Sequence, residues 1–307
     1  MKDEHSSKLE NPLNTLLEDA PFYYTGFGAA YQEDALKIMK KIPDSSINLI
    51  MTSPPYALVF KKEYGNVDAE HYVEWFTKFS NEFHRILTDD GSLVIDIGGA
   101  WNKGTPTRSI YQFELLVHLT KKFHLAQEFY WHNPAKLPAP AEWVTVRRIR
   151  VKDSIETVWW LSKSPYPKAN NRNVLRPYSD DMQRLMVNGY RAKKRPSGHN
   201  ITNKFNIDNG GAIPPNLLTI GNTDSGSPYM KLCEEHSIKP HPARYPKELP
   251  EFFIKFLTAQ NDIVLDPFCG SNVTGMAAEK LKRRWIAIDT VKEYLEGSKF
   301  RFEQVSD

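Results

Sequence analysis

The chain has 307 residues, of which 40% are hydrophobic and 25% charged, and its formal net charge is +3. This composition excludes a disordered polyelectrolyte, and the length suffices for one large core plus an insertion. No apolar run approaches the roughly 18 residues that a membrane span needs, and the opening MKDEHSSKLENPLN lacks an apolar signal segment. We therefore expect a soluble cytoplasmic protein with no membrane anchor.

The cysteines and histidines predict neither disulfides nor a metal site. Cys233 and Cys269 belong to no CxxC or CxxH pattern, so reduced thiols are expected. The nine histidines include no HExxH and no other ligand spacing.

The first half of the chain has a βαβ rhythm. A helical pattern over residues 34–43 precedes a short buried strand, SINLIM (46–51), which stops at Thr52-Ser53-Pro54-Pro55-Tyr56. A helix is predicted over 71–87, DDG predicts a turn, and SLVIDI (92–97) predicts a second strand that ends at Gly98-Gly99.

The rhythm breaks after the middle of the chain and then resumes. A helix (108–123) and two strands (125–134 and 154–164) come first, and between about Ser162 and Lys239 turn residues dominate. An amphipathic helix (249–258) then leads into the clearest βαβ unit, with strands IVLD (263–266) and WIAID (285–289) around the helix MAAEKL.

The turn-rich middle region is strongly basic. From Lys163 to Lys204 there are ten Lys or Arg residues but only two acids, Asp180 and Asp181. Such a cluster is either a solvated loop or an electrostatic footprint for a phosphate backbone.

The turn of the late βαβ unit is typical of a nucleoside site. Gly270 permits close approach of the backbone to a ligand, and Asp289 follows it by 19 residues, at the tip of the second strand, where ribose hydroxyls are bound in such units. The turn is not GxGxxG, so a dinucleotide is less favoured than a nucleoside with a short zwitterionic tail. S-adenosylmethionine (AdoMet) fits that description, although an ordinary βα turn is the alternative.

The segment Thr52-Ser53-Pro54-Pro55-Tyr56 predicts a stiff loop after a buried strand. The two prolines fix their own φ and restrict the preceding residues. A backbone carbonyl and the Ser53 oxygen could accept both hydrogens of an exocyclic amino group while the Tyr56 ring stacks on the base. The nitrogen could then attack a sulfonium methyl group in line, with catalysis mostly by positioning.

TSPPY early and DPFCGSNVTG late together resemble the amino-group DNA methyltransferases of type II restriction-modification systems, in the permuted motif order of the β class. MTSPPYALVFKKEYGN, FYWHNPAKLPAPAEWV, RPSGHNI and HPARYPKELPEFFIKFLT extend the resemblance over most of the chain. It implies an α/β Rossmann-like AdoMet-dependent methyltransferase fold, with a mostly parallel sheet, helices on both faces and a loop-rich target-recognition insertion. The implied domains are the catalytic half of the core (1–161), the target-recognition insertion (162–238) and the AdoMet-binding half (239–307).

The resemblance also implies roles for individual residues. Ser53, Pro54, Pro55 and Tyr56 would form the catalytic loop, and the AdoMet-binding residues would be Asp34, Asp266, Phe268, Cys269, Gly270, Ser271 and Asp289. A member of the family has Phe-Gly-Gly where this turn reads Phe-Cys-Gly, and we interpret Cys269 as a small packed residue.

Ser53 as the first residue of the tetrapeptide favours cytosine N4, because adenine-N6 members of the family mostly have Asp there. C5 methylation is disfavoured, because neither cysteine lies in a Pro-Cys pair. Asp96, at the end of its strand, is expected near Ser53, where it either polarises Ser53, takes up a proton or caps a neighbouring loop.

Double-stranded DNA is the implied partner, with the target base flipped out of the stack. Phosphate contacts are predicted for Lys61, Lys62, Arg147, Arg148 and Arg150, and base contacts for the segment with Lys193, Lys194, Arg195 and His199. The resemblance suggests a short palindromic site such as CAGCTG, a functional pairing with a cognate restriction endonuclease, and a monomer. The alternatives are an adenine-N6 methyltransferase and a non-catalytic DNA-binding or regulatory protein of this fold. A third, a small-molecule or RNA methyltransferase, is disfavoured by the long basic insertion.

Overall fold

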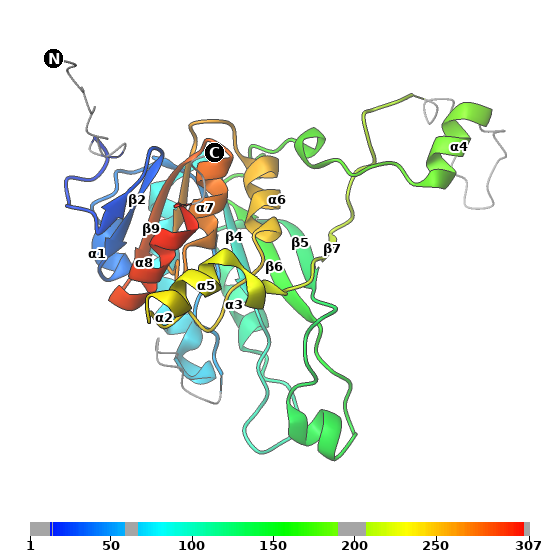
Figure 1. Ribbon diagram of the computed structural model, residues 1–307, viewed down its shortest axis with the longest axis horizontal. Coiled ribbons are helices and arrows are strands. Elements are labelled where there is room, and N and C mark those ends of the chain that lie inside the picture. The colour runs from blue at the N-terminus through cyan, green and yellow to red at the C-terminus, as the bar shows by residue number, and fades with distance from the viewer. Residues whose placement is uncertain (1–12, 14, 59–66, 190–206, 304–307) are drawn as a thin grey trace. The chain divides into compact units, whose positions relative to one another are not determined.

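The computed structural model describes residue 13 and residues 15–58, 67–189 and 207–303 (Figure 1). The chain forms two compact units, one of residues 1–168 with 216–307 and one of residues 169–215. The larger unit contains the whole sheet.

Nine strands of the described residues form one sheet, in the order β1-β2-β9-β8-β3-β4-β6-β5-β7. Their bounds are β1 Tyr23–Tyr24, β2 Gly28–Gln32, β3 Ile47–Thr52, β4 Leu87–Ile97, β5 His124–His132, β6 Ile155–Ser162, β7 Leu217–Thr219, β8 Ile263–Asp266 and β9 Arg284–Asp289. Strands β2, β9, β8, β3 and β4 run parallel, β6 is antiparallel to β4 and to β5, and β1 is antiparallel to β2. In Figure 1 the early strand β2 (blue) lies beside the late strand β9 (red).

Helices cover both faces of the sheet. Their bounds are α1 Ala35–Met39, α2 Tyr72–Ile86, α3 Tyr111–Leu119, α5 Pro228–Glu235, α6 Glu248–Leu257, α7 Val273–Lys280 and α8 Lys292–Ser298, with α4 Asp180–Asn188 in the smaller unit. The buried residues of α1, α2 and α3 share one core cluster, and those of α6 and α7 share a second. Strand β4 contributes side chains to both clusters, because Leu93 and Ile95 belong to the first cluster and Val94 belongs to the second. The predicted fold class is confirmed.

Strands β3 and β8 bring the two loops of interest to one sheet edge. Both are short apolar runs buried on both faces, as central parallel strands are. They pair in parallel, with Leu49 opposite Val264, so both end at the same side. At this edge Thr52 Oγ1 donates a hydrogen bond of 2.8 Å to Asp266 Oδ1.

The smaller unit contains a short 3-10 helix (Asn171–Val174) and α4, whose N-cap Ser179 accepts from the Met182 amide. A β-bridge between Arg176 and Ala212 closes the unit, and the Tyr178 hydroxyl accepts from the Asn209 amide at 2.8 Å.

Three local predictions differ from the structure. The predicted DDG turn lies inside β4, which starts at Leu87 and pairs with β3 through an irregular register. Helix α7 starts before Met276, because the Asn272 side chain caps it by accepting from the Gly275 amide. The turn-rich middle region contains α4, β7 and α5, the last capped by Ser227 with Pro228 in its first turn.

No helix among the described residues is long and apolar enough to cross a membrane.

Candidate active site

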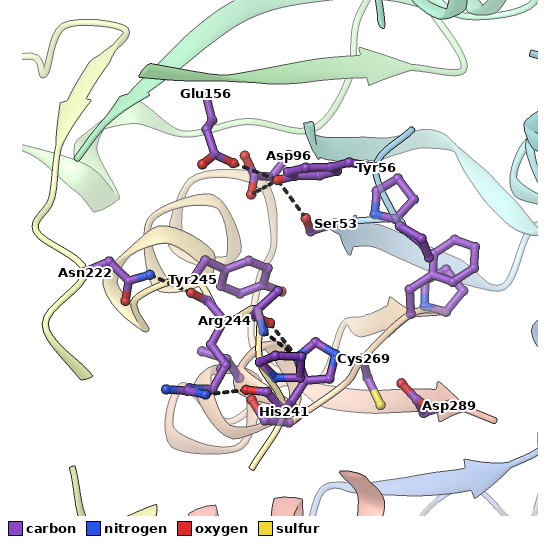
Figure 2. A pocket seen from close by; sticks show the side chains of 18 of the residues that line it. Ser53, Tyr56, Asp96, Glu156, Asn222, His241, Arg244, Tyr245, Cys269 and Asp289 are labelled. Carbon is purple, nitrogen blue, oxygen red and sulfur yellow. Dashed lines mark hydrogen bonds between the residues drawn. The ribbon is translucent and has the colours of Figure 1, made fainter. Parts of the chain in front are cut away.

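A cavity of about 920 Å³ opens at the carboxyl edge of the sheet in the larger unit. The loop after β3 and the turn after β8 both line it, with Asp96 at the end of β4 and Asp289 at the end of β9 (Figure 2). This is where open α/β sheets bind ligands. Two residues assigned to the cofactor by sequence, Gly270 and Asp266, are not among those that line the cavity. The assigned residues that do line it are Asp34, Ser53, Pro54, Pro55, Tyr56, Asp96, Phe268, Cys269, Ser271 and Asp289.

The turn after β8 depends on glycine at position 270. Gly270 has φ +49°, which disfavours residues with a side chain, and a Cβ there would lie 3.0 Å from atoms of the His241 ring. His241, from the HPARYP segment, packs edge-on against Tyr294, and burial lowers its pKa to about 4. The ring beside the turn is therefore neutral at pH 7.

Asp289 links the turn to β9. Its Oδ2 accepts from the Gly270 amide at 2.9 Å, and its Oδ1 accepts from the Val291 amide at 2.8 Å. Burial nevertheless raises the pKa of this carboxyl, because removal from water outweighs the hydrogen bonds from the backbone amides. Each oxygen keeps a second lone pair that a ligand hydroxyl could use.

An aromatic wall stands next to the turn. The Phe268 ring lies 5.9 Å from the Trp75 ring and 5.0 Å from the Phe79 ring, both of which α2 presents to the cavity. Such rings provide a flat apolar surface for a heterocycle. The sequence did not identify Trp75 and Phe79, because their spacing of four residues is that of an ordinary buried helix face.

The two neighbours of Gly270 in the chain, Ser271 and Cys269, are fixed by hydrogen bonds and by burial, respectively. Arg301 donates to the Ser271 carbonyl at 2.7 Å and to its Oγ at 3.1 Å. Cys269 is 7% exposed, and burial raises the pKa of its thiol well above the usual value. A neutral, packed thiol agrees with the sequence interpretation and with no role as a nucleophile.

The loop after β3 is fixed by hydrogen bonds as well as by its prolines. The buried Tyr72 hydroxyl donates to the Pro55 carbonyl at 2.8 Å, and Ser53 Oγ donates to the Tyr56 hydroxyl at 3.2 Å. The Tyr56 ring rests on Gly98, where a Cβ would come within 2.5 Å of the ring.

Two acids meet at the Tyr56 hydroxyl, which lies 2.7 Å from Glu156 Oε2 and 3.3 Å from Asp96 Oδ2 (Figure 2). Glu156 is paired with Lys136, whose Nζ lies 2.7 Å from its Oε1. The Asp96 carboxyl is 1% exposed, and burial and the nearby Glu156 charge raise its pKa well above the usual range. Asp96 thus lies beside Tyr56 and also close to Ser53, whose hydrogen bond partly offsets the rise of the Asp96 pKa. The sequence missed Glu156 and Lys136.

Asp266 lies behind the cavity wall and joins the two loops. It is 2% exposed and accepts from Thr52, from the Phe268 amide and from Thr274, and the Tyr245 hydroxyl lies 3.2 Å away. Burial raises its pKa to about 6 despite these hydrogen bonds. We infer that Asp266 positions the loops rather than contacts a ligand.

The residues predicted to contact DNA are only partly described. Arg147, Arg148 and Arg150 are exposed in the loop that connects β5 to β6. Arg147 forms an ion pair with Glu142, and Arg150 donates hydrogen bonds to the Pro106 carbonyl. The other residues predicted to contact DNA lie outside the described residues: Lys61, Lys62, Lys193, Lys194, Arg195 and His199.

Asp34, which the sequence assigns to AdoMet, caps α1 at the cavity rim by accepting a hydrogen bond from the Lys37 amide.

Comparison with known proteins links this site to one family. A family model described as DNA methylase matches residues 47–300. The chain is 50% identical to the type II methyltransferase M.PvuII of Proteus hauseri over 287 residues, which cover 92% of this chain and 85% of that protein.

Solved structures agree with the sequence match. A PvuII DNA methyltransferase described as cytosine-N4-specific superposes with a TM-score of 0.77 at 43% identity, covering 95% of this chain and 92% of its own. The Thermus thermophilus protein TTHA0409, solved with S-adenosyl-L-methionine, shares the fold with a TM-score of 0.56 at 19% identity, covering 91% of this chain and 95% of its own. The chain belongs to the DNA methylase family of N6- and N4-amino methyltransferases.

Proposed function

We propose that the protein is a site-specific DNA methyltransferase that moves a methyl group from AdoMet to the N4 amine of a flipped cytosine in double-stranded DNA. The observation that carries this proposal is the meeting of the Ser53–Tyr56 loop and the Phe268–Ser271 turn in one cavity. The choice of cytosine N4 is supported by the solved PvuII enzyme, which is described as cytosine-N4-specific and has 43% sequence identity with this chain.

The cofactor side of the cavity fits AdoMet. Asp289 would accept from the ribose hydroxyls, the wall of Trp75, Phe79 and Phe268 would hold the adenine together with Asp34, and the turn at Gly270 allows close approach of the backbone. When bound, AdoMet supplies an electrophilic methyl carbon on a sulfonium sulfur.

The loop after β3 would hold the target amine. Ser53 Oγ and a loop carbonyl accept the amino hydrogens, and the Tyr56 ring stacks on the base. The lone pair of N4 is delocalised into the cytosine ring, and hydrogen bonds to both amino hydrogens draw it out of conjugation. The nitrogen can then face the sulfonium methyl in line, so these residues contribute orientation and hydrogen bonding.

The Gly270→Ala variant should bind AdoMet about tenfold more weakly. An alanine at φ +49° costs about 1–2 kcal/mol, and its Cβ would push the His241 ring away. Gly104→Ala is the matched control, because Gly104 has φ +72° with nothing within 4 Å of the added Cβ. Isothermal titration calorimetry measures both, and equal AdoMet affinities in the two variants would contradict the proposed close approach.

DNA binding would use basic side chains. Arg147, Arg148 and Arg150 would contact phosphates, as would Lys61 and Lys62, and residues 162–238 would form the target-recognition region, with Lys193, Lys194, Arg195 and His199 near base edges. Flipping the cytosine costs a few kcal/mol, which these contacts would offset.

Replacing Arg147 and Arg148 with alanine should reduce the slope of log K against log salt concentration by about 2, since each phosphate contact contributes about 0.9. Lys292→Ala on α8, whose ammonium pairs with Glu296, is the control and should leave the slope unchanged. Fluorescence anisotropy with a duplex over a salt series gives both slopes. An unchanged slope in the double variant would remove these arginines from the interface.

The biological setting follows from the substrate. Site-specific methylation would protect DNA from a cognate restriction endonuclease in the cytoplasm, and a monomer would suit an enzyme that modifies one strand at a time.

The decisive test incubates the protein with AdoMet and a defined plasmid, followed by nucleoside mass spectrometry and sequencing of modified positions. We expect N4-methyldeoxycytidine at one short sequence. N6-methyldeoxyadenosine would establish the adenine-specific alternative, and an absence of both methylated nucleosides would contradict a catalytic role.

A further inference from the structure

The Tyr56 hydroxyl is the middle of a chain of hydrogen bonds that leaves the site. Ser53 Oγ donates to it at 3.2 Å, and it lies 2.7 Å from Glu156 Oε2. The Tyr56 hydroxyl has one hydrogen, which it donates to the nearer acceptor, Glu156 Oε2, rather than to Asp96 Oδ2 at 3.3 Å. Ser53 therefore donates to Tyr56, and Tyr56 donates to Glu156 (Figure 2).

Sheet register explains why Glu156 reaches this place. Asp96 on β4 lies opposite Val158 on β6, and Glu156 is two residues before Val158. Side chains two apart on a strand share a face, so Glu156 is the diagonal neighbour of Asp96. Glycine at position 98 leaves room for the Tyr56 ring, because a Cβ there would lie 2.5 Å from the ring and 3.4 Å from Glu156 Oε2.

The two acids have different surroundings. Asp96 is 1% exposed with no cation in hydrogen-bond contact, and its Oδ1 has no hydrogen-bond partner in the described part of the chain. Burial raises the pKa of Asp96, which favours its neutral form. Glu156 forms an ion pair with Lys136, and the two side chains are 16% and 30% exposed. The acid that can receive a proton and pass it to solvent is therefore Glu156.

Methyl transfer to an amine releases a proton. The nitrogen lone pair forms the new C–N bond, and the electrons of the broken S–C bond stay on sulfur. One hydrogen of the amine then has to leave the cavity, where the neighbouring acid Asp96 is almost fully buried. A preformed chain of hydrogen bonds is a route for that hydrogen.

We propose that Glu156, held by Lys136, positions the Tyr56 hydroxyl and is the final acceptor of the amine proton. The amine proton passes to Ser53 Oγ as the Ser53 hydrogen passes to Tyr56 and the Tyr56 hydrogen passes to Glu156 Oε2. The Glu156 carboxylate becomes a neutral acid, and the proton later leaves to solvent beside Lys136. This assignment rests on the proposed methyltransferase function, and it gives Tyr56 a second role besides stacking.

The test compares Glu156→Gln, Tyr56→Phe and the double variant in single-turnover methyl transfer, with saturating AdoMet and duplex. Each single variant should slow transfer by about 10²-fold, within the range of general acid–base catalysis, while the Kd values for AdoMet and DNA stay within about twofold of the wild type. The double variant should be no slower than the slower single variant, because both changes break one chain.

Glu296→Gln on α8 is the matched control, since it removes the acid of an ion pair with Lys292 far from Tyr56 in the sequence and outside the cavity. It should transfer at the wild-type rate. Lys136→Met should also slow transfer without weakening either ligand, because Glu156 loses the cation that orients it.

Each outcome decides between the two proposals. Inactive wild-type protein would refute the methyltransferase function itself. Active wild type with a fast Glu156→Gln variant would overturn the relay and leave Asp96 as the acceptor. A slow variant whose Kd values rise in proportion, or single effects that multiply in the double variant, would also overturn it.

Discussion

Replacing Ser53 with alanine is expected to lower the single-turnover rate of methyl transfer by about 10²- to 10³-fold, the usual effect of removing one preorganised hydrogen-bonding group. Ser53 follows directly after β3 and is the first side chain of the loop that lines the cavity. Its loss removes both an acceptor for the target amine and the first donor to Tyr56. The AdoMet affinity should not change, because the residues proposed to bind the cofactor lie in the turn after β8, at the end of β9, on α2 and at the N-cap of α1.

Ser46→Ala is the control for this experiment. Ser46 is half-buried, lies directly before the other end of β3, and its hydroxyl donates locally to the Pro43 carbonyl at 2.7 Å. Rapid-quench measurements with labelled AdoMet give both rates. A Ser53→Ala enzyme that keeps more than about a tenth of the wild-type rate would show that the loop holds the amine with its backbone alone.

The Asp266→Ala variant should lose roughly 3 kcal/mol of unfolding free energy and most of its activity. The change leaves the buried Thr52 hydroxyl and the Phe268 amide without their acceptor, and each buried unsatisfied donor costs about 1–3 kcal/mol. It also separates the catalytic loop from the cofactor turn. The Asp266→Asn variant keeps an acceptor oxygen for both groups, so it should be at least as stable as the wild type. Urea denaturation measures the three proteins, and an Asp266→Ala variant as stable as Asp266→Asn would rule out this role of Asp266.

Asp266 should also make stability depend on pH. Burial raises its pKa from 3.8 to about 6, so between these values the folded chain holds a proton that the unfolded chain releases. The free energy of unfolding therefore falls as pH rises through this window, by about 1.4 kcal/mol per unit or about 3 kcal/mol in all, and is then constant. The difference between wild type and Asp266→Asn isolates this carboxyl from the others. A difference that does not change between pH 4 and pH 6 would contradict a protonated Asp266.

The sequence predicted the parts of this site that depend on local patterns. Apolar runs that stop at Thr52 and at Asp266 are central strands, and parallel strands expose their ends at one edge, so the meeting of the two loops could be expected. The permuted order did not hinder this inference, because a parallel sheet places strands by pairing rather than by position in the chain.

The missing parts depend on tertiary placement. Trp75 and Phe79 have the spacing of a core helix, and only the packing of α2 against Phe268 makes them a cavity wall. Glu156 stands in an apolar strand, and its role requires the register of β6 on β4. The pair Ser227-Pro228 is a helix start that turn residues around it concealed.

Asp266 illustrates a different limit. The motif places it among the AdoMet-binding residues, yet three of its hydrogen-bond partners are hydroxyls from β3, α7 and the HPARYP segment. A sequence motif identifies a residue that the site needs. It does not tell whether that residue contacts the ligand or positions the residues that do.

The most direct test of the account is a crystal structure of the protein with a short cognate duplex and sinefungin, an AdoMet analogue that cannot transfer. We predict one cavity occupied by both ligands, with the ribose at Asp289 and an extruded cytosine whose N4 lies at Ser53 and faces the position of the methyl group. A nucleoside bound elsewhere, or a cytosine still stacked in the duplex with the loop after β3 turned away from the analogue, would contradict it.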